Sequence, residues 1–153
     1  MLLGKEQRYK VVGHLGDGTF GRALKCIDLQ TQIVQAVKVI RAVPRYTESA
    51  KIEADILAYL KRKGGCDNGI VDLKDWFMHT SGNGAIQNMC LVFEPLGKSL
   101  FDFIKSNNYK GFELNQIKSI GAQSLQAIEF LHSIGLTHTD LKPENILLKH
   151  DAD

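Results

Sequence analysis

The stretch of sequence that decides the fold is HTDLKPEN, residues 138–145. It places an Asp, a Lys two positions later and an Asn five positions later in a loop, and Pro143 stiffens that loop. This spacing is typical of a loop that acts on a phosphate group, and Asp140 is the predicted base. The alternative is a turn at the end of a helix, in which the Asp and the Asn have no chemical role. Two upstream motifs, in the expected order, favour the first interpretation.

The first upstream motif is GDGTFG, residues 16–21, which lies between two strand-like runs. A dinucleotide-binding fingerprint would open a helix after its third glycine, whereas residues 22–29 read as a strand. The motif therefore predicts a hairpin whose backbone lies over phosphates, because glycines permit that close approach. Taken alone, the pattern fits a plain glycine-rich turn equally well.

The second motif joins a strand to the helix that follows it. Residues 34, 36, 38 and 40 share one strand face, so Lys38 stands among small apolar neighbours. Glu53 falls on the predicted buried stripe of the next helix, with Ile56, Leu57 and Leu60. A charge held away from water is costly unless it is paired. We therefore predict a Lys38–Glu53 ion pair that presents the ammonium to nucleotide phosphates. The alternative is a Lys38 that snorkels at a strand edge beside a solvated Glu53.

The hydrophobic pattern predicts an α+β chain. Strands are expected at residues 9–15, 22–29, 33–40, 70–78 and 89–93, and a helix at residues 47–63. After an interruption at residues 95–97, a short helix is expected at 99–106 and a long one at 115–133, with Asn115 as its N-cap and Gly135 as its stop. The predicted apolar stripe of the long helix is Ile117, Ile120, Leu125, Ile128 and Leu131.

Composition excludes several classes of protein. The chain has 153 residues, is 44% hydrophobic and carries a net charge of +2, which gives no support for nucleic-acid binding. No apolar run is long enough for a membrane span or a secretory signal, so we expect an intracellular protein. Cys26, Cys66 and Cys90 are widely spaced and odd in number, so neither a disulfide framework nor a zinc site is predicted.

The three motifs together resemble the eukaryotic protein kinases. DLKPEN is similar to the serine/threonine branch, and the LAMMER or CDC-like kinases, dual-specificity enzymes of the nucleus, are closer still. That resemblance runs from about residue 9 to 148 and includes RYTESAKIEADIL, LVFEPLGKSLFDFIK and FLHSIGLTHTDLKPENILL. It implies a protein kinase-like fold, with a five-stranded, one-helix N-lobe at residues 1–95 and the first, mostly helical part of a C-lobe at 96–153.

The resemblance also implies a role for each matching residue. Asp140 would accept the proton of a substrate hydroxyl, Lys142 would steady the γ-phosphate, and Asn145 would bind Mg²⁺, while His138 would be structural. Lys38 and Glu53 complete the implied catalytic set. The residues implied to contact ATP are Leu15, Gly16, Gly18, Gly21, Ala23, Ala36, Lys38, the gatekeeper Phe93, the hinge residues Glu94 and Leu96, and Asp102 near the ribose.

Two residues depart from the pattern of the wider kinase family. Ala23 replaces the Val that usually packs on the adenine, which weakens that contact by about 1 to 2 kcal/mol at ~0.8 kcal/mol per buried carbon. Thr139 replaces the Arg that pairs with a phosphorylated activation loop in many kinases, although the LAMMER pattern has a Thr there. Regulation through that Arg is therefore not expected.

The sequence ends at Asp153 without a D-F-G, A-P-E or LAMMER segment. We expect a 153-residue polypeptide to bind ATP but to transfer phosphate poorly, because metal ligands carry much of this chemistry. Its long helix should expose an apolar face that needs a partner or a further segment. The resemblance implies protein substrates, among them Arg/Ser-rich splicing-type proteins, and a nuclear rather than cytoplasmic location. The alternatives are a short non-catalytic module that binds nucleotide or protein and, less favoured by DLKPEN, a small-molecule phosphotransferase.

Overall fold

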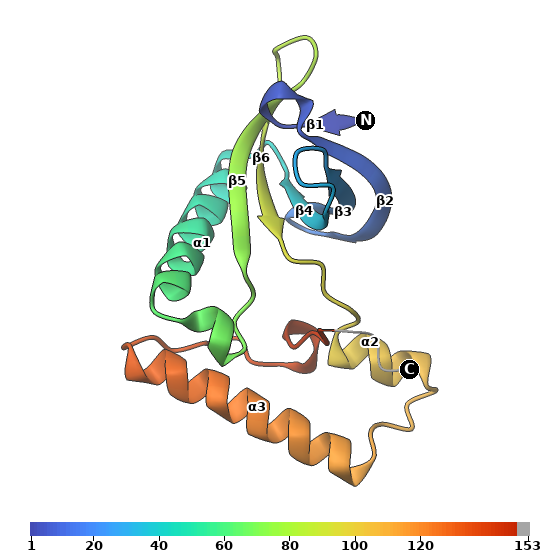
Figure 1. The fold of residues 1–153 in the computed structure, drawn as a ribbon, viewed down its shortest axis with the longest axis vertical. Helices are drawn as coiled ribbons and strands as arrows, with labels where there is room; N and C mark the ends of the chain where they lie inside the picture. The colour runs from blue at the N-terminus through green and yellow to red at the C-terminus, as the bar shows by residue number, and fades with distance from the viewer. Residues whose placement is uncertain (150–153) are drawn as a thin grey trace. The chain divides into compact units, whose positions relative to one another are not determined.

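The computed structural model describes residues 1–149, which form two compact units (Figure 1). The first unit contains Met1–Lys63 and Val71–Pro95, and the second contains Gly64–Ile70 and the chain from Leu96 onward. The first unit is mainly a β-sheet with one long helix, and the second is helical. The fold is therefore α+β, as the hydrophobic pattern predicts.

The sheet of the first unit is antiparallel, with strand order β1-β2-β3-β4-β6-β5. Its strands are β1 (Leu2–Leu3), β2 (Tyr9–Gly18), β3 (Gly21–Asp28), β4 (Val34–Ile40), β5 (Leu73–Thr80) and β6 (Gln87–Phe93). The five predicted strands are present as β2 to β6, and β1, which pairs with the start of β2, adds a sixth. Two residues are too few to show the alternation by which a strand is recognised.

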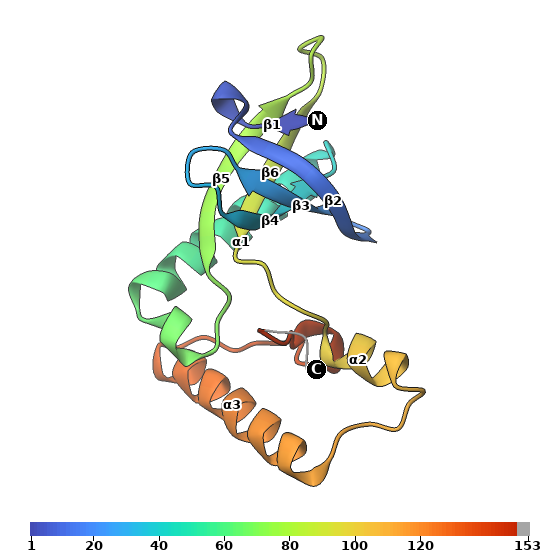
Figure 2. The same ribbon diagram turned by 45° about the vertical axis from the view of Figure 1, so that its right-hand side comes forward.

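Each face of this sheet carries its own hydrophobic cluster. On one face, helix α1 (Pro44–Arg62) buries Ala50 and Ala54 against Ile40, Met89 and Leu91. Figure 2 shows this helix behind the sheet. The cluster of the other face consists of Leu3, Tyr9, Cys26, Val37, Cys90 and Val92. Cys26 and Cys90 are both buried.

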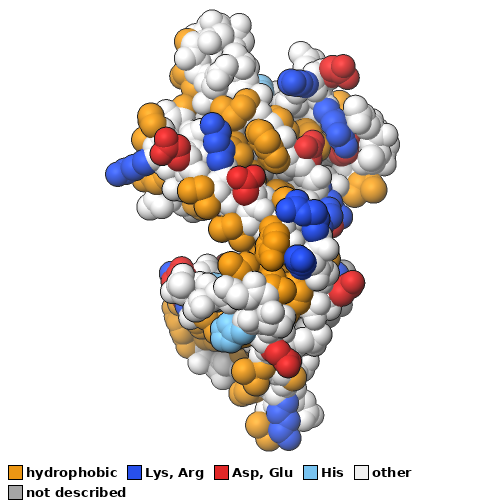
Figure 3. All heavy atoms as spheres, turned by 90° about the vertical axis from the view of Figure 1, so that its left-hand side faces the viewer, with side chains coloured by type: hydrophobic (Ala, Val, Ile, Leu, Met, Phe, Trp, Pro, Cys, Tyr) orange, Lys and Arg blue, Asp and Glu red, His pale blue; other side chains and the backbone are white. Residues whose placement is uncertain are grey.

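Helix α1 differs from its prediction at its start and on its buried face. It begins at Pro44, three residues before the predicted start, because proline suits the first turn of a helix, where its missing N–H costs no hydrogen bond. Ile56, predicted to be buried, is 43% exposed. The small residues Ala50 and Ala54 are buried instead, which lets the helix lie close to the sheet. Figure 3 shows hydrophobic and charged side chains mixed on the α1 side of this unit.

The second unit contains two helices, α2 (Leu100–Ser106) and α3 (Leu114–Ser133). The Ser99 hydroxyl accepts a hydrogen bond from the Asp102 backbone N–H (3.0 Å), so a serine cap starts α2. The N-cap of α3 is Glu113, not Asn115 as predicted, and its backbone N–H donates to the Gln116 side chain at 2.9 Å. Gly135, with φ +81°, follows the end of α3 as predicted.

The predicted apolar stripe of α3 is largely exposed. Leu131 is buried, whereas Ile117 is 52% and Leu125 72% exposed. Ile117 and Leu125 thus lie on a face of α3 that the described residues leave open, as expected from the sequence. None of the helices within residues 1–149 is long and apolar enough to cross a membrane.

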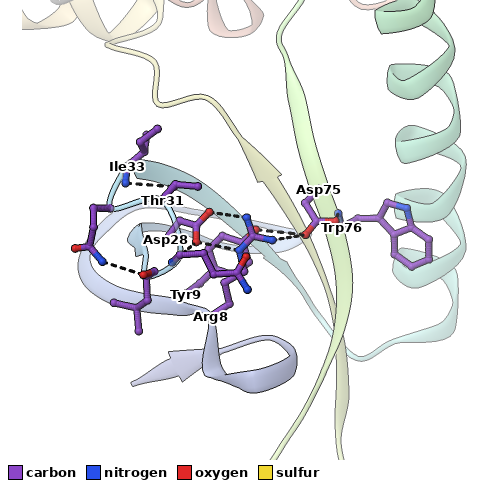
Figure 4. A network of polar contacts seen from close by, with 10 residues as sticks. Arg8, Tyr9, Asp28, Thr31, Ile33, Asp75 and Trp76 are labelled. Carbon is purple, nitrogen blue, oxygen red and sulfur yellow. Dashed lines mark hydrogen bonds and ion pairs between the residues drawn. The ribbon is translucent and has the colours of Figure 1, made fainter.

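A polar clamp, formed by Arg8, Asp28 and Asp75, joins three parts of the first unit (Figure 4). Arg8 donates from Nε and Nη2 to the two oxygens of Asp28, at 2.9 and 2.6 Å. Its Nη1 lies 3.9 Å from Asp75 of β5, which also accepts a hydrogen bond from the Tyr9 hydroxyl. Asp28 is 2% exposed, and the hydrogen bonds from Arg8 lower its pKa to about 2. The clamp was not predicted from the sequence.

The polar clamp predicts a free energy of unfolding that depends on pH. The pKa of Asp28 is lower in the folded protein than in the unfolded chain, so its carboxylate contributes about 2 kcal/mol to the free energy of unfolding. This contribution is present above the pKa of the unfolded chain, near 4, and is lost as the pH falls toward about 2. Urea unfolding of wild type at pH 7 and at pH 3 should show this loss. Asp28→Asn should lower stability at pH 7 by about 3 kcal/mol and weaken the pH dependence.

Asp75→Asn is the matched control, because Asp75 is more exposed and lies farther from Arg8. It should cost less than 1 kcal/mol, the scale of an exposed ion pair. Equal losses in the two variants would show that Arg8 does not stabilise the fold mainly through Asp28.

Candidate functional site

The glycine hairpin is the turn between β2 and β3, at residues 16–21 (Figure 2). Gly21 has φ +145°, and a Cβ there would lie 2.0 Å from the Val39 carbonyl oxygen, so no other residue fits. A Cβ at Gly18 would lie 2.3 Å from the ring of Phe20, whereas one at Gly16 would meet nothing within 4 Å. The prediction of a hairpin rather than a strand-to-helix turn is confirmed.

The predicted ion pair between Lys38 and Glu53 is present. Lys38 on β4 donates from Nζ to both carboxylate oxygens of Glu53 on α1, at 3.2 and 3.1 Å. The expectation that both charges are held away from water is wrong, because their side chains are 23% and 39% exposed.

Sequence reasoning missed a further contact of Lys38. The Phe20 ring of the glycine hairpin has its centre 4.5 Å from the Lys38 Nζ, a cation–π distance. A phenylalanine in a glycine-rich turn shows no periodic pattern, so only the three-dimensional structure reveals where the ring goes.

The strand register gathers several predicted nucleotide contacts on the Lys38 face of the sheet. Ala23 stands opposite Lys38, and Ala36 stands opposite Phe93. Cross-strand partners share a face, so two alanines and one aromatic ring accompany the ammonium. Small residues leave space on the sheet surface, and this face can accept a flat apolar group such as a nucleobase.

The remaining predicted nucleotide contacts lie elsewhere. Leu15 stands in a register shift of β2 and is 52% exposed. The Glu94 backbone N–H donates to the Asp72 carbonyl (3.3 Å), and the Glu94 carboxylate accepts from the Asp72 N–H. Leu96 and Asp102 belong to the second unit, where Asp102 is exposed in the first turn of α2.

The catalytic-loop residues predicted from HTDLKPEN come together in the second unit. Asn145 donates from Nδ2 to the Asp140 carbonyl (2.8 Å) and to its carboxylate oxygen Oδ2 (3.0 Å). The Lys142 Nζ lies 3.4 Å from the same Oδ2. The Asp140 N–H donates to the His138 carbonyl (2.8 Å) and to the Nδ1 atom of its ring (3.2 Å). The loop thus orients one carboxylate oxygen of Asp140 through its own side chains.

Backbone pairing anchors the end of this loop. The N–H of Leu100 donates to the Ile146 carbonyl (2.8 Å), and the N–H of Gly97 donates to the Leu148 carbonyl (2.7 Å). An isolated bridge joins Ser99 to Leu147 between these bonds. The segment before α2 therefore holds the residues that follow Asn145.

Thr139 is strained. Its φ is +62°, a left-handed conformation that β-branched residues rarely adopt. Such a conformation costs about 1 to 3 kcal/mol and is typical of functional sites. Asp140 directly follows Thr139, so the strained residue helps set the direction of the predicted base.

The catalytic loop offers an oxygen atom of the kind that Mg²⁺ binds. No group of three or more His, Cys, Asp or Glu that could hold a metal ion occurs within residues 1–149. Mg²⁺ in phosphate-transfer sites usually takes one or two protein oxygens together with phosphates and water. The Asn145 side-chain amide supplies one such oxygen, Oδ1, because its hydrogen bonds to Asp140 are made by Nδ2.

Comparison with known proteins places the chain in a family. Residues 9–153 match the model of the protein kinase domain. The chain belongs to the protein kinase family. A crystal structure of a kinase domain is similar to this chain, with 45% identity and a TM-score of 0.88. The match covers 98% of this chain and 42% of the chain in the crystal structure.

The curated relatives are kinases of the predicted branch. The serine/threonine-protein kinase AFC3 of Arabidopsis thaliana is 43% identical over 92% of this kinase chain. The dual specificity protein kinase CLK2 of Mus musculus is 42% identical over 93% of it. The predicted resemblance to LAMMER or CDC-like kinases is confirmed. The chain spans about a third of the length of these relatives, 34% of AFC3 and 28% of CLK2.

The strain at Thr139 can be tested by mutation. Thr139→Asn should raise the free energy of unfolding by about 1 kcal/mol, because Asn tolerates a positive φ far better than a β-branched residue. Thr139→Val, which keeps the branch, should give no increase. Urea titrations of the three proteins measure the difference. An Asn variant no more stable than wild type would contradict a strained Thr139.

Proposed function

We propose that this chain is the ATP-binding part of a serine/threonine or dual-specificity kinase that transfers the γ-phosphate of ATP to protein hydroxyls. The observation that carries the proposal is the Lys38–Glu53 ion pair beside the glycine hairpin. An ammonium held at a fixed place by a carboxylate is suited to phosphate oxygens. The names of AFC3 and CLK2 support the same reaction.

The residues of the first unit would bind the nucleotide. Ala23, Ala36 and Phe93 share a face with Lys38, as the strand register requires, and would receive the adenine. Gly18 and Gly21 bring backbone, without side chains, close to the phosphates. Lys38 would contact the α- and β-phosphates, while Glu53 keeps it in position.

The residues of the second unit would act at the transferred group. Asn145 and Lys142 hold Oδ2 of Asp140, and the carboxylate would orient a substrate hydroxyl and accept its proton. Lys142 would also steady the γ-phosphate, and the Asn145 amide oxygen would hold Mg²⁺. Mg²⁺, when bound, neutralises charge that develops on the phosphates.

Substrate and location follow only from the relatives. The name of CLK2 describes a dual-specificity kinase, so we propose serine, threonine and tyrosine hydroxyls as acceptors. Arg/Ser-rich proteins and a nuclear location are proposed from the resemblance to LAMMER kinases alone.

A second candidate function is that of a non-catalytic module that binds nucleotide or protein. The observation in its favour is the exposed apolar face of α3, where Leu125 is 72% exposed. The two functions make different demands on a polypeptide of residues 1–153. The kinase proposal requires nucleotide binding and further metal ligands for efficient transfer, since no D-F-G follows Asn145 within this sequence, whereas the module requires only binding of nucleotide or protein.

Binding of ATP and of adenosine to residues 1–153 tests the proposed site. By calorimetry, Lys38→Met should weaken ATP binding about 10- to 100-fold, the value of a charge-assisted hydrogen bond, and leave adenosine binding unchanged. Lys10→Met is the matched control, because Lys10 is an exposed lysine of β2 far along the strand from the glycine hairpin. Equal losses in both variants would contradict a specific role for Lys38.

A phosphotransfer assay separates the two candidate functions. With Mg²⁺, ATP and an Arg/Ser-rich peptide, the 153-residue polypeptide should show little transfer, whereas a polypeptide extended through a D-F-G segment should transfer phosphate. Asp140→Asn should abolish that activity without weakening ATP binding. An extended polypeptide that binds ATP but never transfers phosphate would favour the non-catalytic module.

Ala23→Val offers a test by gain of affinity. The extra carbons should pack on the adenine and tighten adenosine and ATP binding alike, by about 5- to 30-fold at ~0.8 kcal/mol per buried carbon. Nonspecific damage rarely improves binding. Unchanged affinity for both ligands would show that Ala23 does not face the adenine.

A further inference from the structure

Phe20 links the glycine hairpin to the lysine of the proposed ATP site. Its carbonyl accepts a hydrogen bond from the Arg41 N–H (2.7 Å), which fixes the backbone of the turn against the end of β4. Its ring packs against the cluster that contains Ile40, Ala50 and Leu91. The ring also lies over Lys38, with its centre 4.5 Å from Nζ. The backbone of the turn and the ring of Phe20 are thus held by separate contacts.

The contacts of Lys38 account for most of its capacity to bind an anion. A lysine ammonium has three N–H donors. Nζ donates to both oxygens of Glu53, at 3.2 and 3.1 Å, and the Phe20 ring covers another side of the group. A phosphate that approaches Lys38 from the side of the ring would have to displace the ring.

We propose that Phe20 is a gate on Lys38: its ring covers the ammonium and competes with the phosphates of a nucleotide for it. This inference rests on the proposed function and makes Phe20 a specificity-determining residue of the same site. Ligands with a phosphate chain displace the ring, whereas adenosine, which has no charged group for Lys38, leaves it in place. The competition lowers ATP affinity without affecting contacts with the base.

Gly18 makes this position of the ring possible. A Cβ at residue 18 would lie 2.3 Å from Cε1 and 2.7 Å from Cδ1 of Phe20, so Gly18→Ala would push the ring away from Lys38. A Cβ at Gly16 would meet nothing within 4 Å. The pair Gly18→Ala and Gly16→Ala is therefore a matched test of the ring position that leaves Phe20 itself intact.

Nuclear magnetic resonance of the Lys38 ε-methylene group reports the ring directly, because an aromatic face shifts nearby protons upfield. In the full 153-residue chain without ligand, wild type and Gly16→Ala should show this upfield shift. Gly18→Ala and Phe20→Leu should lose it. Saturating ATP or inorganic tripolyphosphate should remove the shift from wild type, and adenosine should leave it unchanged.

Affinity provides the second readout. Phe20→Leu keeps an apolar side chain but removes the aromatic face, so ATP should bind about 2- to 30-fold more tightly, the range of a cation–π contact, and adenosine equally well. A leucine variant that binds ATP more weakly, or that changes ATP and adenosine affinity equally, would overturn the gate and show a packing role instead.

The two proposals fail in different ways. If ATP binds wild type and the Lys38 shift persists in the complex, the gate is wrong and the nucleotide site stands. If ATP does not bind but tripolyphosphate removes the shift, the gate stands and the nucleotide site is wrong. An absent upfield shift in ligand-free wild type also overturns the gate.

Discussion

The position of a single ammonium group, that of Lys38, determines how the proposed nucleotide site is built. Lys38 stands on β4, an interior strand, so its stem is fixed on both sides by neighbouring strands. Glu53 comes from α1, whose distance from the sheet is set by the burial of Ala50 and Ala54. The ion pair is partly exposed and adds little stability. Its main consequence is geometric, because it fixes the direction of the ammonium relative to the glycine hairpin.

Both faces of the sheet carry a buried hydrophobic cluster, but the predicted nucleotide contacts lie on the Lys38 face. The face away from α1 holds a closed cluster around Val37 and Val92, and the polar clamp of Arg8 and Asp28 joins the ends of its strands. The Lys38 face instead carries alanines at positions 23 and 36, which leave room for a ligand. A site with small residues loses packing energy.

The sequence was sufficient where a pattern repeats or a motif has fixed spacing. Alternation predicted strands β2 to β6, and the spacing of HTDLKPEN predicted that Asp140, Lys142 and Asn145 meet. The failures have physical causes. Strand β1 is two residues long and has no period, and a capping Glu113 resembles any surface glutamate. The burial of Ala50 rather than Ile56 depends on how closely α1 approaches the sheet, which helical periodicity alone does not specify.

Contacts made by residues without a repeating pattern could not be predicted. The clamp joins Arg8 to Asp28, 20 residues away, and the Phe20 ring reaches Lys38 across the hairpin. Both depend on which strands become neighbours. Kinase resemblance supplied the roles of matching residues, but it did not supply these contacts.

The interactions that fix the conformation of the catalytic loop differ from those that fix the sheet. Its aspartate is held by Asn145, five residues away, and by a strained Thr139 next to it, so its geometry arises within a few residues. Strain persists only where the surrounding structure over-determines the backbone. On the two sides of Thr139, the Asp140 N–H donates to the His138 carbonyl, and the Asn145 Nδ2 donates to the Asp140 carbonyl. The direction of Asp140 therefore depends on contacts within residues 138–145, whereas the direction of Lys38 depends on the sheet and α1.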